Sequence, residues 1–344
     1  MKKLLNTLYV TTQGTYLSKE GETVKVNVDR EVVLSLPIHT LDGIVCFGQV
    51  SMSPPLMGLC GERGVTVAFL NPNGRFLARV DGPVSGNVLL RRRQYRWADD
   101  AERSAEMARW VVAAKITNSR AVLRRAQRDY PDREGAERID AAQHHLFHLL
   151  QHLKQPGPNV DRIRGWEGEA ANTYFGVFDH LIAGDKEAFS FTRRSRRPPL
   201  DPVNALLSFL YTLLAHDVRS ALEGVGLDPA VGYLHRDRPG RHGLALDMME
   251  EMRAYFADRL ALSLINRRQV KAKGFTQSET GAVVMDSETR RSVLVAYQER
   301  KRETMTHPFL KERMEIGLLP HTQALLLARH IRGDLESYPP FIWR

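Results

Sequence analysis

A glutamate between two glycines is the first candidate for chemistry in this sequence. Glu167 lies between Gly165 and Gly168 in a stretch whose hydrophobic pattern is otherwise helical. Each glycine inside a helix costs about 1 kcal/mol relative to alanine. Because a glycine has no side chain, Gly168 indicates a close backbone approach beside the Glu167 carboxylate.

A histidine followed by two carboxylates is the second candidate. His235 begins a basic loop, and Asp247 and Glu250 lie one helical turn apart after it, so both can share one face. One histidine with carboxylates is a hard, oxygen-rich ligand set, better suited to Mg²⁺ or Mn²⁺ than to structural zinc. Among arginines, such a metal fits phosphodiester chemistry, in which it polarises a phosphoryl oxygen and helps to position an attacking hydroxyl.

Spacing alone leaves other interpretations open. A buried network of Glu, His and Arg ion pairs would use the same residue types without a metal. His216 and Arg219 form the His-x-x-Arg pair of recombinases that use a tyrosine nucleophile. Such an enzyme needs a tyrosine near the chain end, and Tyr297 and Tyr338 are available. The sequence has no glycine-rich phosphate loop, Gly-x-Ser-x-Gly elbow or His-Glu-x-x-His motif, which argues against P-loop ATPases, α/β-hydrolases and zincins.

Helices must position both candidates, and a β-rich segment precedes them. Short β-branched runs, a hairpin over 65–78 and one helix from the cap Ser53 to Gly64 are predicted within 1–86. Beyond this segment helices are predicted over about 87–97, 100–128, 134–154, 159–177, 203–223, 244–263, 287–303 and 320–333, with a small hairpin in 271–286. The predicted fold class is α+β, with a β domain over 1–86 and a larger all-α domain over 87–344.

The positive charge of the chain belongs to the predicted helical domain. The 344 residues carry a formal net charge of +9, but residues 1–86 hold eight Lys and Arg against seven Asp and Glu. Arginines cluster at 91–93, 193–197, 236–241 and 300–302. Any one cluster is explained by a solvent-exposed helix face. Several clusters together favour a nucleic-acid-binding surface, because Arg and Lys bind phosphates.

Composition also predicts the environment. With 43% hydrophobic and 26% charged residues the chain is typical of globular proteins, which argues against disorder or a collagen-like fold. The two cysteines, Cys46 and Cys60, suit a reducing compartment. No signal peptide is visible, and the longest apolar stretch, 203–215, is too short and too polar to span a bilayer. We therefore expect a cytoplasmic protein without membrane contact.

Three blocks of the sequence resemble the CRISPR-associated adaptation integrase/endonuclease family, the metal-dependent nucleases that insert new spacers into CRISPR arrays. The first runs from Arg164 through Glu167 to Gly168, and the second contains Arg193 and Arg196 before Asp201-Pro202-Val203-Asn204. The third joins His235 to the helix Leu244-Ala245-Leu246-Asp247-Met248-Met249-Glu250-Glu251. Their order, their spacing and the β-then-helical layout match over essentially the whole chain.

The resemblance implies a metal-dependent DNA endonuclease and integrase. It places a divalent ion, Mg²⁺ or Mn²⁺, on Glu167, His235 and Glu250, with Asp247 as a supporting residue or an alternate ligand. Arg238 matches a basic position that would contact the scissile phosphate. Further DNA contacts are expected from Arg164, Arg193, Arg196 and Arg241.

The resemblance also implies partners. It predicts a homodimer formed through the β domains, and two such dimers on either side of a dimer of a small companion protein. Double-stranded protospacer DNA would be held in this complex, and its 3′-OH ends would attack the CRISPR repeat in transesterifications that yield branched DNA. A non-catalytic nucleic-acid-binding scaffold is the alternative, followed by the tyrosine recombinase.

Overall fold

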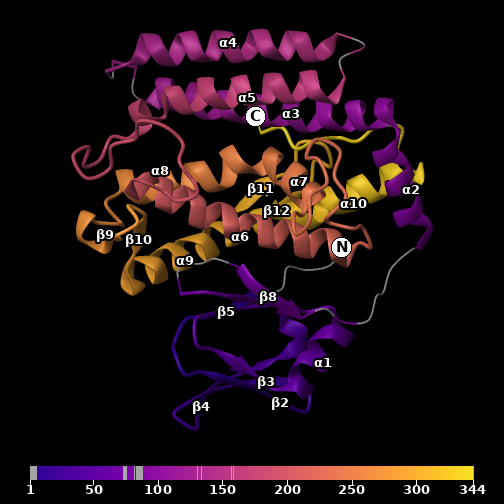
Figure 1. Ribbon diagram of the computed structural model, residues 1–344, viewed down its shortest axis with the longest axis vertical. Helices are drawn as coiled ribbons and strands as arrows, with labels where there is room; N and C mark the ends of the chain where they lie inside the picture. Colours follow the sequence, from indigo (N-terminus) through magenta and orange to yellow (C-terminus); the bar gives the residue numbers. More distant parts are fainter. Residues whose placement is uncertain are drawn as a thin grey trace. The chain divides into compact units, whose positions relative to one another are not determined.

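The computed structural model describes residues 6–72, 76–80, 82, 88–129, 131–132, 134–155, 157 and 159–343. The chain divides into two compact units, Met1–Gly86 and Asn87–Arg344 (Figure 1). The first unit is rich in strands and the second is mostly helical, so the α+β prediction is confirmed.

In the described part of the β unit, two four-stranded sheets are accompanied by one α-helix and a short 3-10 helix, Ile38–Thr40. One sheet has the order β1-β5-β7-β8 and the other β4-β3-β2-β6. The neighbours β1–β5, β5–β7 and β2–β6 are parallel, and the remaining neighbours are antiparallel. The strands are β1 (Asn6–Val10), β2 (Tyr16–Glu20), β3 (Thr23–Val28), β4 (Glu31–Pro37), β5 (Leu41–Phe47), β6 (Ser51–Met52), β7 (Thr66–Leu70) and β8 (Phe76–Val80).

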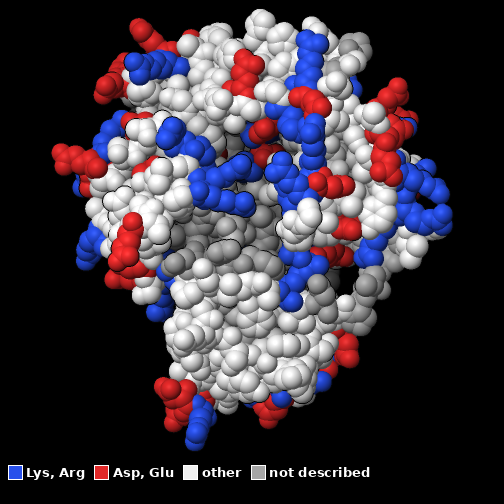
Figure 2. Space-filling model, in the orientation of Figure 1, with Lys and Arg blue, Asp and Glu red and all other residues white. Residues whose placement is uncertain are grey.

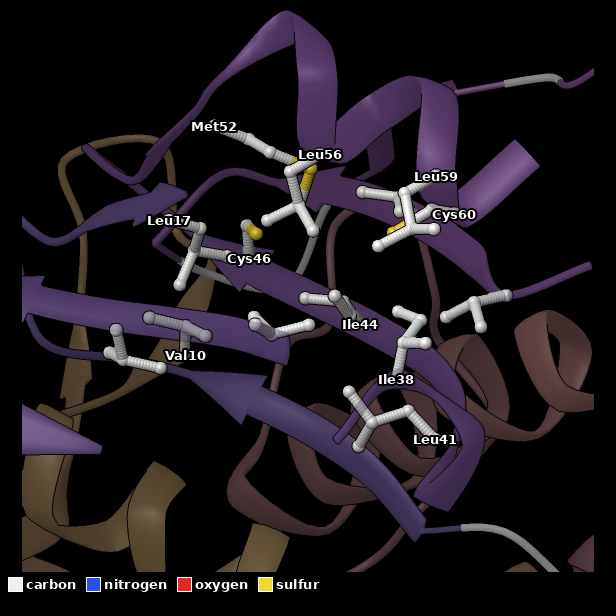
Figure 3. Close-up of a cluster of buried hydrophobic side chains, with 14 of the residues drawn as sticks. Val10, Leu17, Ile38, Leu41, Ile44, Cys46, Met52, Leu56, Leu59 and Cys60 are labelled. Atoms are coloured by element: carbon white, nitrogen blue, oxygen red, sulfur yellow. The ribbon is translucent and has the colours of Figure 1, made fainter. Parts of the chain in front are cut away.

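Local sequence explains the α-helix of this unit, α1 (Pro54–Arg63). The Ser53 side chain accepts a hydrogen bond from the Leu56 amide at its start, and Gly64 ends it with a left-handed φ of 67°. Leu56 and Cys60 face the strands and pack with Leu17 and Ile44 in a fully buried apolar cluster (Figure 3). The predicted helix is therefore confirmed. The β7–β8 hairpin is confirmed as well, although part of its turn, 73–75, lies outside the described residues.

One long helix organises the helical unit. This helix, α3 (Ala101–Asp129), packs against α4, α5 and α7, and α6 packs against α7 and α10 (Figure 1). Because α5 and α7 both lie against α3, side chains from three helices can meet at one place. The other helices are α2 (Val88–Asp99), α4 (Ala136–Lys154), α5 (Val160–Gly176), α6 (Pro202–Gly224), α7 (Gly243–Arg253), α8 (Arg259–Asn266), α9 (Ser287–Arg302) and α10 (Leu319–Arg332).

The helical unit differs from the sequence prediction at two places, a π-helical turn and a second hairpin. A π-helical turn, Ala254–Asp258, joins α7 to α8 where one regular helix was expected. Two small hairpins are also present: β9 (Phe275–Gln277) with β10 (Val283–Met285), which was expected, and β11 (Thr304–Thr306) with β12 (Arg313–Glu315), which was not. Three-residue strands are too short to leave a periodic pattern. No helix among the described residues combines the length and hydropathy that a membrane span requires.

Candidate active site

The carboxylate of Glu250 lies at the centre of a buried ion cluster. Its side chain is only 2% exposed, on the face of α7 that packs against α3. Its Oε1 atom pairs with Nη2 of Arg253 at 2.8 Å, one turn along the same helix. Its Oε2 atom lies 2.9 Å from Nζ of Lys115, which comes from α3. Glu250 is therefore held by two cations.

The second carboxylate of the cluster comes from α5. The Asn159 side chain begins this helix by accepting a hydrogen bond from the Arg162 amide at 2.9 Å. Two turns further on, Oε1 of Glu167 contacts the same Lys115 ammonium that pairs with Glu250. Glu167 is 22% exposed whereas Lys115 is 8% exposed, so the cluster opens to solvent on the Glu167 side. One lysine thus bridges two of the three predicted metal ligands.

The positive neighbours decide the charge of Glu250. Complete burial is the largest effect on this group, and alone it would raise the pKa. The charges of Arg253, Lys115 and His235 act against burial and lower the pKa of Glu250 to about 2. The carboxylate is therefore ionised at neutral pH, although it is buried.

Asp247 holds the third predicted ligand, His235, in place. Its Oδ1 atom accepts hydrogen bonds from the main-chain nitrogen of His235 at 3.0 Å and from Nδ1 of the ring at 2.7 Å. Its Oδ2 atom accepts from the amides of Tyr233 at 2.6 Å and Leu234 at 3.0 Å. A carboxylate only accepts, so Nδ1 carries a hydrogen and donates it to Asp247. Asp247, 1% exposed, therefore orients the histidine.

A glycine allows this loop to lie against the start of α7. A Cβ atom at Gly232 would come within 2.6 Å of the Gly243 carbonyl carbon and within 2.8 Å of Oδ2 of Asp247. Real Cβ atoms are not found so close to main-chain atoms. Gly232 is thus required for the hydrogen bonds between Asp247 and the loop.

The side chains of Glu167, Glu250 and His235 supply oxygen and nitrogen atoms of the kinds that bind a hard divalent cation. Glu167 and Glu250 offer carboxylate oxygens, and Oε2 of Glu250 is buried without an aligned hydrogen bond despite its ion pair with Lys115. His235 offers Nε2 while a carboxylate fixes its other nitrogen, as is usual for metal-binding histidines. Among the described residues, however, no three His, Cys, Asp or Glu side chains are gathered closely enough to hold a metal ion. The Lys115 ammonium takes that central place instead.

An arginine-lined cleft of about 410 Å³ begins at His235. Arg164 joins its two walls, because its Nε donates to the main-chain oxygen of Leu234 at 2.8 Å. Burial, followed by the charge of Arg238, lowers the pKa of Arg241 in this cleft. The residues that line it are Asp161, Arg164, Gly165, His235, Arg236, Arg238 and Arg241. Lys and Arg side chains also gather over the helical unit in Figure 2, whereas the β unit is largely uncharged in that view.

The other predicted arginines lie outside this cleft. Arg193 and Arg196 are exposed, and neither lines the cavity. Their neighbour Arg194 is turned inward, where its guanidinium donates to Oδ1 of Asn204 at 2.5 Å and to Oγ of Ser208 at 3.1 Å. The basic run 193–197 therefore contributes both surface charge and an internal structural arginine.

The tyrosines proposed for a recombinase are not available for attack. Tyr297 is fully buried and donates to Oδ2 of Asp217 at 2.8 Å. Tyr338 is buried as well, and its hydroxyl donates to Oε2 of Glu251 at 3.0 Å. Arg219 pairs with Glu223 along α6 at 3.2 Å. The recombinase interpretation is therefore wrong.

Sequence reasoning missed Lys115, the residue that joins the two glutamates. The signal was present, since Lys115 is a single charge in the run Val111-Val112-Ala113-Ala114-Lys115-Ile116, on the buried face of α3. Lysines are almost never fully buried unless they are paired, so such a position predicts an internal carboxylate partner. Which carboxylate it meets depends on how α3, α5 and α7 pack.

Comparisons with known proteins show the family of the chain. Residues 8–299 match the family described as CRISPR associated protein Cas1. The chain is 58% identical over 344 residues to CRISPR-associated endonuclease Cas1 1 of Chlorobaculum tepidum, with complete coverage of both chains. It is 52% identical over 348 residues to CRISPR-associated endonuclease Cas1 2 of Rhodospirillum rubrum, again with complete coverage of both.

Solved structures show the same fold. A CAS1 protein from Thermotoga maritima superimposes with a TM-score of 0.82 at 23% identity, over 95% of this chain and 97% of that one. Similar chains also occur in a Cas6-RT-Cas1–Cas2 complex, with a TM-score of 0.81 at 22% identity over 98% of this chain and 36% of that one, and in a TtCas1–DNA complex, with 0.59 at 16% over 94% and 92%. With full-length relatives above 50% identity and a family match over most of its length, the chain belongs to the CRISPR-associated Cas1 endonuclease family.

Proposed function

We propose that this Cas1 chain cleaves DNA and joins DNA ends at Glu167, His235 and Glu250, with Mg²⁺ or Mn²⁺ as cofactor. One observation carries the proposal: two carboxylates from different helices converge on a single cation, and Asp247 orients His235 through the Nδ1 atom of its ring. When bound, a divalent cation would polarise the scissile phosphoryl group and lower the pKa of the attacking hydroxyl.

The arginine-lined cleft supplies the DNA contacts in this proposal. Arg164, Arg238 and Arg241 surround His235, and guanidinium groups bind phosphate oxygens in pairs. A 3′-OH end of protospacer DNA held there attacks a phosphodiester of the CRISPR repeat. A new phosphodiester bond forms as the bond from phosphorus to the repeat's own 3′-oxygen breaks, and the cut repeat strand leaves with a 3′-OH, which gives the branched product. The hydroxyl comes from DNA, so the chain needs no nucleophile of its own. Arg193 and Arg196 would extend the contact along the duplex.

We assign the β unit to homodimer formation. Its strand β4 is a sheet edge that exposes adjacent apolar side chains, with Val32 55%, Val33 59% and Leu34 42% exposed. An edge strand with exposed apolar residues is a surface that natural proteins normally cover. A second copy of the chain on this edge fits that need, and two such dimers would flank a dimer of a small companion protein.

Strand transfer with matched variants tests the catalytic proposal. Wild type is incubated with protospacer duplex and repeat DNA in Mn²⁺ or in EDTA, beside Glu167→Gln and Glu250→Gln. Glu169→Gln is the control, because Glu169 lies on the same helix but is exposed and pairs with His145 at 2.8 Å. We expect loss of both hydrolysis and joining in EDTA and in the first two variants, and retained activity in the control.

The same experiment separates the alternative function. A scaffold with a decayed site would bind both DNAs under every condition without producing branched or cleaved products. Activity that persists in EDTA, or in Glu167→Gln, would contradict the proposed mechanism.

A further inference from the structure

Lys115 occupies the place where the two acidic ligands of the proposed site meet. Its ammonium contacts Oε1 of Glu167 and lies 2.9 Å from Oε2 of Glu250. The side chain extends from α3 towards α5 and α7, and it is 8% exposed. Among the described ion pairs, this is the one lysine that bridges two carboxylates from different helices.

The charges of this cluster already balance. Glu167 and Glu250 carry two negative charges, and Lys115 and Arg253 carry two positive ones. His235 and Asp247 form a separate pair. A divalent cation added to the balanced cluster would leave two uncompensated positive charges in a buried place, which is costly unless one resident cation leaves.

Lys115 is the cation that can leave. Arg253 is fixed by more than its ion pair, because its guanidinium also lies 4.6 Å from the ring centre of the half-buried Tyr211. The cavity next to Lys115 between α3, α5 and Arg253 measures about 10 Å³, enough for a water molecule but not for a displaced side chain. The open direction is past Glu167, where a long lysine can extend its ammonium to solvent.

We propose that Lys115 is a built-in counter-cation that holds Glu167 and Glu250 together in the metal-free protein and must be displaced when a divalent cation binds. The inference rests on the proposed function, since it takes these two residues as metal ligands. It makes metal binding a competition: the lysine keeps the two carboxylates close and prevents their mutual repulsion, and it weakens metal affinity in return.

Metal affinity, measured without DNA, tests this role. Full-length wild type and Lys115→Met are titrated with Mn²⁺, and free Mn²⁺ is followed by electron paramagnetic resonance. We expect Lys115→Met to bind Mn²⁺ at least about tenfold more tightly, because it removes both the competitor and a like charge. In EDTA the same variant should melt at a lower temperature than wild type, and saturating Mn²⁺ should raise its Tm by more.

Two further variants keep the test decisive. Lys115→Arg retains the charge and should keep the weak affinity of the wild type. Lys301→Met removes another buried lysine, which pairs with Asp217 at 3.1 Å, and should leave the Mn²⁺ affinity unchanged. Equal or weaker Mn²⁺ binding by Lys115→Met would overturn the inference. If Glu167→Gln and Glu250→Gln bind Mn²⁺ as tightly as the wild type does, the proposed metal site itself is wrong, and this outcome is distinct from a failure of the Lys115 inference alone.

Discussion

Asn118 on α3 donates through Nδ2 to the main-chain oxygen of Glu251 on α7, at 2.7 Å. The same Nδ2 donates to the main-chain oxygen of Phe341 at 2.8 Å, and Oδ1 of Asn118 accepts from the Trp343 amide at 2.8 Å. The Glu251 side chain accepts from the Phe341 amide at 2.8 Å. The C-terminal segment therefore ties together the two helices that carry Lys115 and Glu250.

Asn118→Ala should disturb both stability and catalysis. It leaves two buried carbonyl oxygens and one amide without their partner, which we expect to cost about 2–4 kcal/mol. Because α3 and α7 lose a direct connection, strand transfer at saturating Mn²⁺ should fall about tenfold. Urea unfolding and the joining assay measure the two effects. Asn266→Ala is the control: Asn266 bonds Leu181 and Ala183 away from the site, so it should lower stability alone.

Asp247→Asn should impair His235 without unfolding the chain. The amide has one acceptor oxygen where the carboxylate has two, so the ring and the loop amides can no longer all be satisfied. Groups that orient a metal-binding histidine are worth about 10–100-fold in activity or metal affinity. We expect a loss of that size in strand transfer, with a native circular dichroism spectrum. Asp286→Asn, which changes only the cap of α9, should keep full activity, and equal activity of both variants would refute the role of Asp247.

Gly168→Ala should stabilise the protein and reduce its rate of strand transfer. A Cβ atom at Gly168 would meet no protein atom within 4 Å, so the packing of this chain does not require the glycine. Alanine should add about 0.5–1 kcal/mol to the free energy of unfolding, because glycine is a poor helix former. If DNA approaches the helix beside Glu167, the added methyl group should reduce strand transfer. Gly58→Ala, at a similarly open position of α1, should stabilise without any loss of activity.

Asp258 predicts a pH dependence of stability. Burial, opposed by the hydrogen bond from Tyr211 and the charge of Arg253, raises the pKa of Asp258 from 3.8 to about 6. The folded state thus binds this proton more tightly than the unfolded state, so its contribution is complete below pH 3.8 and is lost as pH rises through 6. The wild type should lose about 2 kcal/mol relative to Asp258→Asn between pH 4 and pH 7. The free energy of unfolding of both proteins is measured with urea at each pH. A difference between the two proteins that stays constant from pH 4 to pH 7 would contradict the prediction.

Much of this protein follows from local sequence. The helix from Ser53 to Gly64 was predictable because its cap, its proline and its terminal glycine are adjacent in the chain. The long helices of the second unit repeat an apolar pattern over many turns, and this pattern, with the earlier β-branched runs, determines the α+β class. The hairpin of β11 and β12 escaped prediction because three residues a strand carry too little pattern.

The candidate site could be predicted from the sequence only in part. The residue types and spacing around Glu167, His235 and Glu250 select these side chains as candidates, because the chemistry they favour depends on side-chain type. Tertiary structure alone decided two further features. Both carboxylate oxygens of Asp247 accept hydrogen bonds from the loop that contains His235, and Lys115 lies between the two glutamates. Lys115 is 52 residues from Glu167 and 135 from Glu250, and the packing of α5 and α7 against α3 brings them together. No local rule encodes such a contact, because its energy exists only once all three helices are in place.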